Sequence, residues 1–294
     1  MASEFQLALN RWQQHWAGLT TDQKQQLRSD AAAEALGLDQ QRFSSAQKKL
    51  WQQVQVDKLP VALQIAGRLT LLYREITSLQ VNSQAAMWQL AENLVPGQSF
   101  RQQSSALYSD HKLVFQAPSA DKIPALFDSW CTRQPRTLAG MAAKFQHWMQ
   151  LQPFSQGNHL LGLLWLKAGL RQLHPSFCDL PLEQQLRKQQ SDYQKLLWQP
   201  PGQEWSDWLA LQLHQAIRAT LPAGEAPKAE RNWFDTEDEI IRYLKKDNRL
   251  SARQLALQLG LSCRAIEKQL AKLKARGQLQ RVGPAKGGRW LIQH

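Results

Sequence analysis

The sequence predicts a mainly α-helical protein in two parts, with one short β-hairpin inside the first part. Apolar residues recur at helical spacing through most of the chain, for example along one face of residues 138–151. Weak alternation of apolar and polar residues is confined to residues 99–119, around the sequence KLVFQ, and indicates a hairpin. The stretch 221–232 is rich in Pro, Gly and charged residues, which is typical of a linker between domains.

The helices are expected in the order in which this spacing recurs. Residues 1–58, rich in Gln, Ala, Leu and Lys, are expected to form surface helices. The helical pattern continues from Pro60 until the sequence VPG interrupts it. The remaining helices of the first part are expected over residues 121–133, 138–151, 159–173, 181–198 and 204–220. The sequence LLGLLWLKAGL is apolar on nearly every side, which is typical of a helix at the centre of a bundle.

Positive charge is concentrated at the C-terminal end of the chain. The 294 residues carry a formal net charge of +12, and residues 235–294 hold 13 Lys and Arg against 6 Asp and Glu. From Asn248 onward, Glu267 alone opposes ten basic residues. This distribution favours a polyanionic partner, either a nucleic acid or an acidic surface.

The cysteines and the N-terminus indicate a protein of a reducing compartment. Cys131, Cys178 and Cys263 are far apart and form no CxxC pair, so neither a disulfide framework nor a zinc site is expected. The N-terminus lacks the basic start and apolar run of a signal peptide, and the longest apolar run, 160–166, is too short to span a bilayer. The expected location is cytoplasmic, on the nucleoid when the protein is bound to DNA, with no metal and no membrane partner.

Residues 235–294 follow the order helix, helix, turn, helix, hairpin. Thr236 and Glu239 have the spacing of a capping box at the start of the first helix. Ser251 and Ser262 are positioned to cap the second and third helices. The residues after the third helix predict two short strands around a Gly-rich tip.

This order resembles that of winged helix-turn-helix domains, which bind double-stranded DNA. In such a domain the third helix enters the major groove and the wing meets phosphate or the minor groove. The resemblance implies DNA contacts by residues on the second and third helices and on the wing. These residues are Arg253, Ser262, Arg264, Lys268, Lys272, Lys286 and Arg289. The alternative is a winged helix that contacts proteins, with a basic face that is only solvated.

The sequence QPFSQGNHLLGL, at 152–163, resembles the signature of the Fic family, H-P-F-x-[DE]-G-N-G-R-x-x-R. Four of its positions match the signature, namely Pro153, Phe154, Gly157 and Asn158. The segments KIPALFDSW, AGMAAKFQHWMQLQPF and EWSDWLALQLHQAI resemble the family's helices in the family's order. The sequence RVG followed by KGGRW resembles the end of a winged helix that the family often carries. The resemblance implies a Fic-like helical domain with a hairpin flap.

Fic proteins are known for AMP transfer from ATP to protein hydroxyls, and this chain departs from the family at the chemical positions. Gln152 stands where the family has its His general base, and an amide cannot take up a proton near neutral pH. Gln156 stands where the family has an acidic Mg²⁺ ligand, and a neutral carbonyl is a poor substitute. Leu160 and Leu163 replace the two arginines that hold phosphate. No catalytic residue and no cofactor are therefore expected.

Any residual nucleotide binding is expected at Gly157, Asn158 and His159, because main-chain N–H groups at the start of a helix attract phosphate. Otherwise these positions are expected to be structural. Asn158 would cap the apolar helix, and Phe154 would pack into the core.

The expected organisation is a helical region at 1–58, a Fic-like domain at 59–222, a linker at 223–234 and a winged helix-turn-helix at 235–294. The expected function is DNA binding in transcriptional regulation, in a bacterial-type protein that forms homodimers. The Fic-like domain would serve dimerisation, or the sensing of a protein partner or small-molecule effector. Two alternatives stay open, an AMP transferase with an atypical active site and a protein-interaction module that does not bind DNA.

Overall fold

The structure, a computed structural model, describes residues 2–39, 44, 46–47, 50–51, 55–109, 112–221, 240–241, 243–245, 247–259, 263–283 and 288–292. The chain divides into two compact units. One unit is Trp12–Thr220, called the body below, and the other is Leu221–His294 together with Met1–Arg11.

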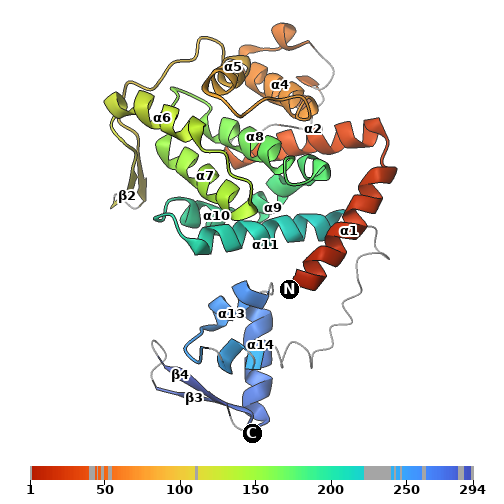
Figure 1. Cartoon of the computed structure of the whole chain (residues 1–294), viewed down its shortest axis with the longest axis vertical. Helices are drawn as coiled ribbons and strands as arrows, with labels where there is room; N and C mark the ends of the chain where they lie inside the picture. The colour runs from red at the N-terminus through yellow and green to blue at the C-terminus, as the bar shows by residue number, and fades with distance from the viewer. Residues whose placement is uncertain are drawn as a thin grey trace. The chain divides into compact units, whose positions relative to one another are not determined.

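The body is built from α-helices, short 3-10 turns and one hairpin (Figure 1). Its α-helices are α1 (Ala2–Gly18, which begins before the body), α2 (Thr21–Leu38), α4 (Val61–Arg74), α5 (Gln84–Leu94), α6 (Ile123–Thr132), α7 (Leu138–Leu151), α8 (Asn158–Leu170), α9 (Leu182–Lys188), α10 (Gln190–Leu197) and α11 (Gln203–Thr220). Its 3-10 helices are η1 (Val56–Lys58), η2 (Ala120–Lys122) and η3 (Pro175–Asp179). Within the described part of the chain, no helix has the length and apolar character needed to cross a membrane.

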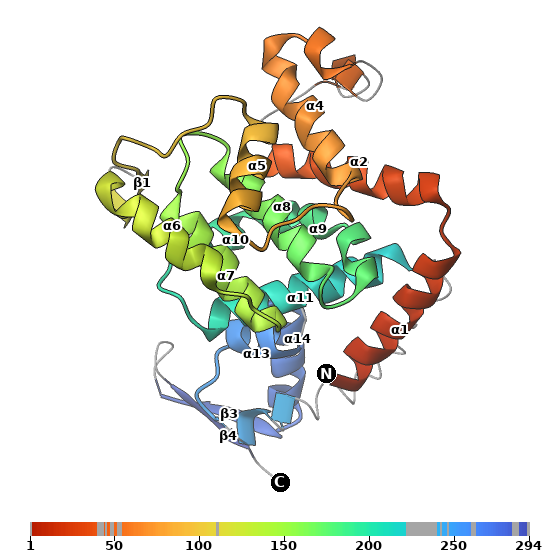
Figure 2. The same cartoon turned by 45° about the horizontal axis from the view of Figure 1, so that its top comes forward.

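Helix α8 is the centre of the body, as its all-round apolar sequence predicts. Every residue from Leu160 to Leu170 is buried, and α8 contacts α7, η3, α2, α4 and α5 (Figures 1 and 2). The one charged residue on this helix, Lys167, forms a buried ion pair of 2.7 Å with Glu183. The hydroxyl of Tyr73 donates to the other carboxylate oxygen of Glu183 at 2.9 Å. A buried charge is costly unless it is paired, and this pair satisfies that requirement.

Helix α2 packs more deeply than the surface helices expected over residues 1–58. One face of α2 is buried and packs against α4 and α9. Much of this face is alanine, including Ala32 and Ala35, so the apolar signal in the sequence is weak although the helices approach closely. Arg28 on α2 forms a 2.6 Å ion pair with Asp179, which also accepts a 2.7 Å hydrogen bond from the indole of Trp16. These contacts fix α1 and α2 to η3.

Most of the other predicted elements are found within a few residues of their expected bounds. The helix at 138–151 is found as α7, and the helix at 181–198 is divided into α9 and α10. The predicted hairpin consists of β1 (Ala106–Ser109) and β2 (Lys112–Gln116), which pair antiparallel with a register shift after Leu107.

The second unit contains α13 (Ala252–Leu259), α14 (Cys263–Ala275), β3 (Leu279–Val282) and β4 (Arg289–Ile292), and residues 240–241 and 243–245 are also helical. The two strands pair antiparallel, with Leu279 opposite Ile292. Its core is made by one cluster of buried side chains. They are Ile240, Leu244, Leu250, Leu255, Ala256, Ile266, Leu270, Leu273, Leu279 and Trp290. The mainly α fold with two short hairpins agrees with the predicted fold class.

Candidate functional site

The turn between α7 and α8, residues 152–157, holds the positions that resemble the Fic signature. Gln152 ends α7 in the left-handed region, with φ of 45°, and Gly157 precedes α8 with φ of 73°. Asn158 is not the N-cap, contrary to the prediction, because Gly157 occupies that position and Asn158 is the first helical residue. The Asn158 side chain instead accepts from the main-chain N–H of Phe154 at 2.9 Å and donates to its carbonyl at 2.8 Å. This pair of bonds closes the turn.

Phe154 is packed into the core, as predicted. It lies among the rings of Trp88, Phe100, Phe127 and Trp148, with centroids 4.8 to 6.0 Å away.

The start of α8 is held against α7 by Trp148. The indole N–H of Trp148 donates to the carbonyl of Asn158 at 2.7 Å. Gly162 makes room for this indole, since a Cβ at position 162 would lie 2.7 Å from Trp148 Cδ1. The geometry of the turn therefore follows from packing and main-chain bonds.

Gln152 and Gln156 are engaged with the segment 98–105 that precedes the hairpin. The side-chain carbonyl of Gln152 accepts a hydrogen bond from the hydroxyl of Ser105. The main-chain carbonyl of Gln156 accepts from the side chain of Gln98 at 3.0 Å, while the Gln156 side chain is exposed. Neither side chain supplies a base or a charge to the turn.

Leu160 and Leu163 point into the core of the body, with exposed fractions of 1% and 2%. A side chain at either position cannot reach a ligand at the surface of the turn without leaving the core.

His159 lies at the first turn of α8 and is held by two partners. Its Nε2 lies 2.8 Å from the hydroxyl of Tyr193, and its Nδ1 lies 3.3 Å from Asp39. Burial raises the pKa of Tyr193, so its hydroxyl stays protonated over the ordinary pH range. His159 is therefore ordered by the body and has no free ring nitrogen.

Arg101 is a residue of this region that the sequence reasoning missed. The residue is 7% exposed, and its guanidinium donates to the main-chain carbonyls of Gln152 and Gln103 at 2.9 Å each, of Leu151 at 3.4 Å, and of Pro118. Burial lowers the pKa of Arg101 from its ordinary value, and no carboxylate pairs with it among the described residues. The charge is balanced by carbonyl dipoles alone.

The basic face of the second unit lies on α14. Ile266, Leu270 and Leu273 are buried in the core cluster, whereas Arg264 and Lys268 are exposed and Lys272 is half-buried. Residues four apart on a helix lie on one side of it, so the three cations form one stripe.

Arg253 on α13 and Arg289 on β4 are also exposed. Ser262 and Lys286, the other two predicted DNA contacts, lie outside the described residues, as do Thr236 and Glu239. Ser251 caps α13 as predicted, because its Oγ accepts from the main-chain N–H of Gln254 at 3.2 Å.

The wing hairpin is anchored by Trp290. Its indole donates to the carbonyl of Leu250 at 2.8 Å, and its main-chain N–H donates to the carbonyl of Asn248 at 2.7 Å. The ammonium of Lys274 and the guanidinium of Arg281 each lie 5.1 Å from the centre of the ring, within range of a cation–π interaction.

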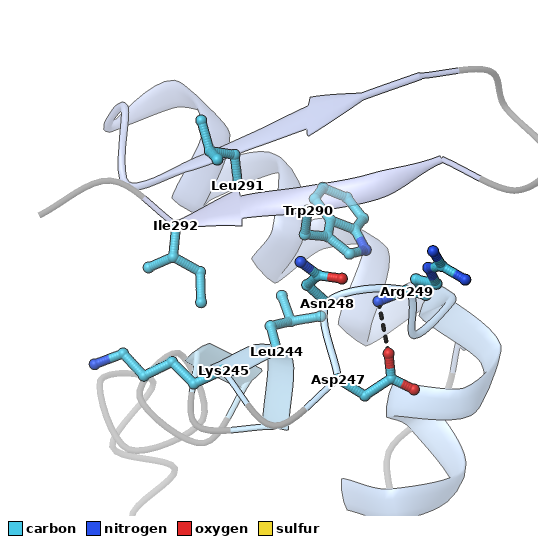
Figure 3. A pocket seen from close by; sticks show the side chains of 8 residues that line it. All are labelled: Leu244, Lys245, Asp247, Asn248, Arg249, Trp290, Leu291 and Ile292. Carbon is cyan, nitrogen blue, oxygen red and sulfur yellow. Dashed lines mark hydrogen bonds between the residues drawn. The ribbon is translucent and has the colours of Figure 1, made fainter.

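A hollow of about 460 Å³ lies between β4 and the segment 244–249 (Figure 3). Trp290 and Ile292 point from β4 toward this segment, whereas Leu291 points away from it (Figure 3). Lys245 and Arg249 line the hollow and are exposed, so they extend the positive charge of the unit. Sequence reasoning did not single them out, although the run KKDNR was a signal.

Comparison with known proteins agrees with both parts of this description. Residues 235–280 match the family model of winged helix-turn-helix DNA-binding domains. The crystal structure of a Fic family protein from Desulfovibrio desulfuricans G20 superposes with a TM-score of 0.61 and 18% sequence identity. The match covers 99% of this chain and 94% of that one. No curated protein matches the chain by sequence.

The chain has the fold of a Fic family protein with a C-terminal winged helix-turn-helix. Both resemblances seen in the sequence are confirmed at the level of the fold. No group of three or more His, Cys, Asp and Glu side chains that could hold a metal ion occurs in the described parts of either unit.

Proposed function

We propose that this protein is a sequence-specific DNA-binding regulator of transcription, in which the Fic-like body has no AMP-transfer chemistry. The observation that carries the proposal is the stripe of cations on α14, opposite the face that α14 buries in the winged-helix core. In this family of folds the corresponding helix enters the major groove, and cations on its free face contact phosphates and base edges. Arg289, which is exposed on the wing, is a proposed phosphate contact, and Ser262 and Lys286 are proposed contacts on the same grounds.

The contacts of the turn support the loss of AMP transfer. At the four positions where the Fic signature has a base, a metal ligand and two cations, this chain has two neutral amides and two core leucines. His159, the imidazole within the segment 152–163, is held between Asp39 and Tyr193. Gly157 and Asn158 stay candidates for weak nucleotide binding through the main chain.

The body then serves assembly or sensing. Helix-turn-helix regulators commonly read two half-sites as a dimer, with half-sites spaced by about one helical turn of DNA or a multiple of it. We propose that this protein binds its operator as a homodimer and that the body supplies the dimer contact or receives an effector or protein partner.

DNA binding is tested by fluorescence anisotropy over a range of salt concentrations, on a fragment selected from genomic DNA by the purified protein. The double variant Arg264→Ala, Lys268→Ala is expected to lower affinity by about 10- to 100-fold and to reduce the salt slope by about 2. The control variant Lys122→Ala, Arg136→Ala removes the same charge from exposed positions of the body and is expected to change the affinity less than about threefold.

A salt-independent affinity, or equal behaviour of the two double variants, would show that the basic face does not bind DNA. The chain would then be better explained as a protein-interaction module.

AMP transfer is tested separately with labelled ATP and Mg²⁺. The expected result is no label on the protein or on a candidate substrate. Labelling that disappears in Gly157→Ala and in Asn158→Ala would show that the turn is an active site with atypical residues. The proposal that the body has no AMP-transfer chemistry would then be wrong.

A further inference from the structure

Glu267 is an exception on the basic surface to which the proposed function assigns DNA. It is the only acidic residue among residues 248–294, where ten Lys and Arg occur. It is exposed on α14, as are Arg264, three positions before it, and Lys268, the next residue. Residues three apart on a helix are neighbours, so this carboxylate lies beside the stripe of cations. It repels the phosphates of DNA and lowers affinity unless a donor on the DNA offsets the cost.

The carboxylate of Glu267 is held by a thiol and by no cation. The Sγ of Cys263, the first residue of α14, donates to Glu267 Oε1 at 3.6 Å. Partial burial and the neighbouring carboxylate raise the pKa of Cys263, so the thiol keeps its proton and stays a donor at neutral pH. Within the described residues Glu267 forms no ion pair, although Arg264 lies within one turn of it. One weak donor leaves most of the acceptor capacity of the carboxylate unused.

The contact with Cys263 directs the carboxylate toward the N-terminal end of α14. Cys263 precedes Glu267 by about one helical turn, and side chains on a helix lean toward its N-terminus. In helix-turn-helix domains the N-terminal residues of the recognition helix contact base edges, whereas contacts to phosphate fix the position of the domain. Under the proposed function, Glu267 therefore lies in the part of α14 that faces bases.

The chemistry of the major groove restricts what this carboxylate can bind. A carboxylate only accepts hydrogen bonds, and the base edges of the groove offer two donors, the N4 amino group of cytosine and the N6 amino group of adenine. Adenine carries the N7 acceptor beside its amino group, which repels a carboxylate, whereas cytosine carries no acceptor beside N4 in the groove. An amide such as that of Gln fits adenine, because it donates to N7 while it accepts from N6.

We propose that Glu267 determines specificity by accepting a hydrogen bond from the N4 amino group of a cytosine in the operator. The inference rests on the proposed function, because it requires α14 in the major groove. At a site without this cytosine the carboxylate finds no suitable donor and its repulsion of the phosphates is not offset. Glu267 thus selects among sequences, whereas the charges of Arg264 and Lys268 attract all DNA.

The test compares the sites that the full chain and three variants select from a randomised duplex library. The unmodified chain is expected to select a site with a cytosine position that depends on residue 267. Glu267→Gln is expected to replace cytosine by adenine at that position, and Glu267→Ala to select no base there, with the rest of the site unchanged.

Asp247→Asn is the matched control for these variants. It removes the same charge from an exposed position of the same unit, outside α14, and keeps the side-chain oxygen that accepts from the main-chain N–H of Arg249 at 2.9 Å. It should select the same site as the unmodified chain.

Fluorescence anisotropy tests the contact on the unmodified chain. N4-methylcytosine at the identified position keeps the base pair and removes the donor from the major groove, so it should weaken binding by about tenfold. The affinity of Glu267→Ala should be the same, within about twofold, for the methylated and unmethylated sites. A role of Glu267 in folding alone would change neither the selected base nor the response to the methyl group.

The inference is overturned if Glu267→Gln selects the same site as the unmodified chain, or if N4-methylcytosine leaves the affinity unchanged. Salt-dependent binding to the selected site would then keep the proposed function, whereas no sequence selection by the unmodified chain would remove both. Circular dichroism identifies a variant that fails to fold. In that case N4-methylcytosine, placed at each cytosine of the selected site in turn, decides the question on the unmodified chain.

Discussion

The guanidinium of Arg101 donates through Nε to the main-chain carbonyl of Gln152, 2.9 Å away, and so joins the segment before the hairpin to the end of α7. The same two segments are joined by main-chain bonds from Arg101 to Pro153 at 3.1 Å and from Ser155 to Ser99 at 2.9 Å. The turn and the approach to the hairpin therefore form one hydrogen-bonded unit.

Replacing Arg101 is expected to destabilise this unit. Arg101→Met keeps much of the aliphatic stem and leaves up to four carbonyls without their donor, so the free energy of unfolding should fall by about 2 to 4 kcal/mol. Urea unfolding followed by circular dichroism measures the change. The exposed Arg136→Met is the control, with an expected effect within about 0.5 kcal/mol. Equal effects of the two variants would mean that the Arg101 bonds contribute nothing.

Two glycines of α8 are expected to respond to alanine in opposite ways. A Cβ at Gly162 would meet the Trp148 ring at 2.7 Å and Met149 Sδ at 3.1 Å, so Gly162→Ala should destabilise the body by about 1 to 3 kcal/mol. A Cβ at Gly169 would have its nearest neighbour, Met141 Sδ, at 3.9 Å. Gly169→Ala should be neutral or stabilise by up to about 1 kcal/mol, through its helix propensity. Thermal unfolding of both variants checks the difference in sign.

Restoring the arginines of the Fic signature is expected to disrupt the body. Leu160→Arg or Leu163→Arg would place an unpaired charge in a core position and should lower the free energy of unfolding by about 4 kcal/mol or more. Gln156→Arg, which adds the same charge to an exposed position of the turn, should have an effect of about 0.5 kcal/mol or less. Denaturant unfolding of the three variants tests this. A stable, folded Leu160→Arg protein would show that the position can turn toward solvent.

The stability of the body is expected to rise from pH 7 to pH 9 through Lys144. Burial lowers the pKa of Lys144 to about 8, with Arg133 adding repulsion and Cys131 opposing it. Its ammonium lies 4.1 Å from the centre of the Trp130 ring and donates to the carbonyl of Arg133. The unfolded chain, with an ordinary lysine pKa near 10.5, binds more protons than the folded chain above pH 8. The free energy of unfolding should therefore increase with pH.

Relative to Lys144→Met, the increase should be about 1 kcal/mol between pH 7 and pH 9. Denaturant unfolding of both proteins at each pH gives this difference. The comparison stops at pH 9 because of Cys131, whose pKa burial raises to about 11. Above the ordinary pKa of a thiol, the folded chain holds this proton more tightly than the unfolded chain, so the free energy of unfolding falls as the pH rises. Parallel curves for the two proteins would contradict the prediction.

Local sequence patterns predicted the helices, because residues within one or two turns decide which face is apolar. The bounds of α7 and the central position of α8 follow from such patterns. The same reasoning missed the N-cap of α8. Asn158 is a good capping residue, but its side chain bonds back to Phe154, and the left-handed Gly157 occupies the cap. Capping propensity alone does not distinguish these two arrangements.

Contacts between distant parts of the chain were not predictable in this way. His159 is held by Tyr193, 34 positions away, and by Asp39, 120 positions away. The role of Arg101 depends on carbonyls of three separate segments, for which a single arginine in a polar stretch gives no signal. The buried face of α2 was hidden because alanine has little apolar surface, whether or not it is buried.

The burial of α8 on all sides has a consequence for the time scale on which the turn at its start can change. Main-chain amides of a helix with no face to solvent exchange their hydrogens only when the whole body opens. In the turn, the main-chain N–H of the buried Phe154 is bonded to the side chain of Asn158, the first residue of this helix, so we expect this amide to share that slow exchange. The bonds that hold this part of the turn all come from the body itself, so we expect its shape to last as long as the body stays folded.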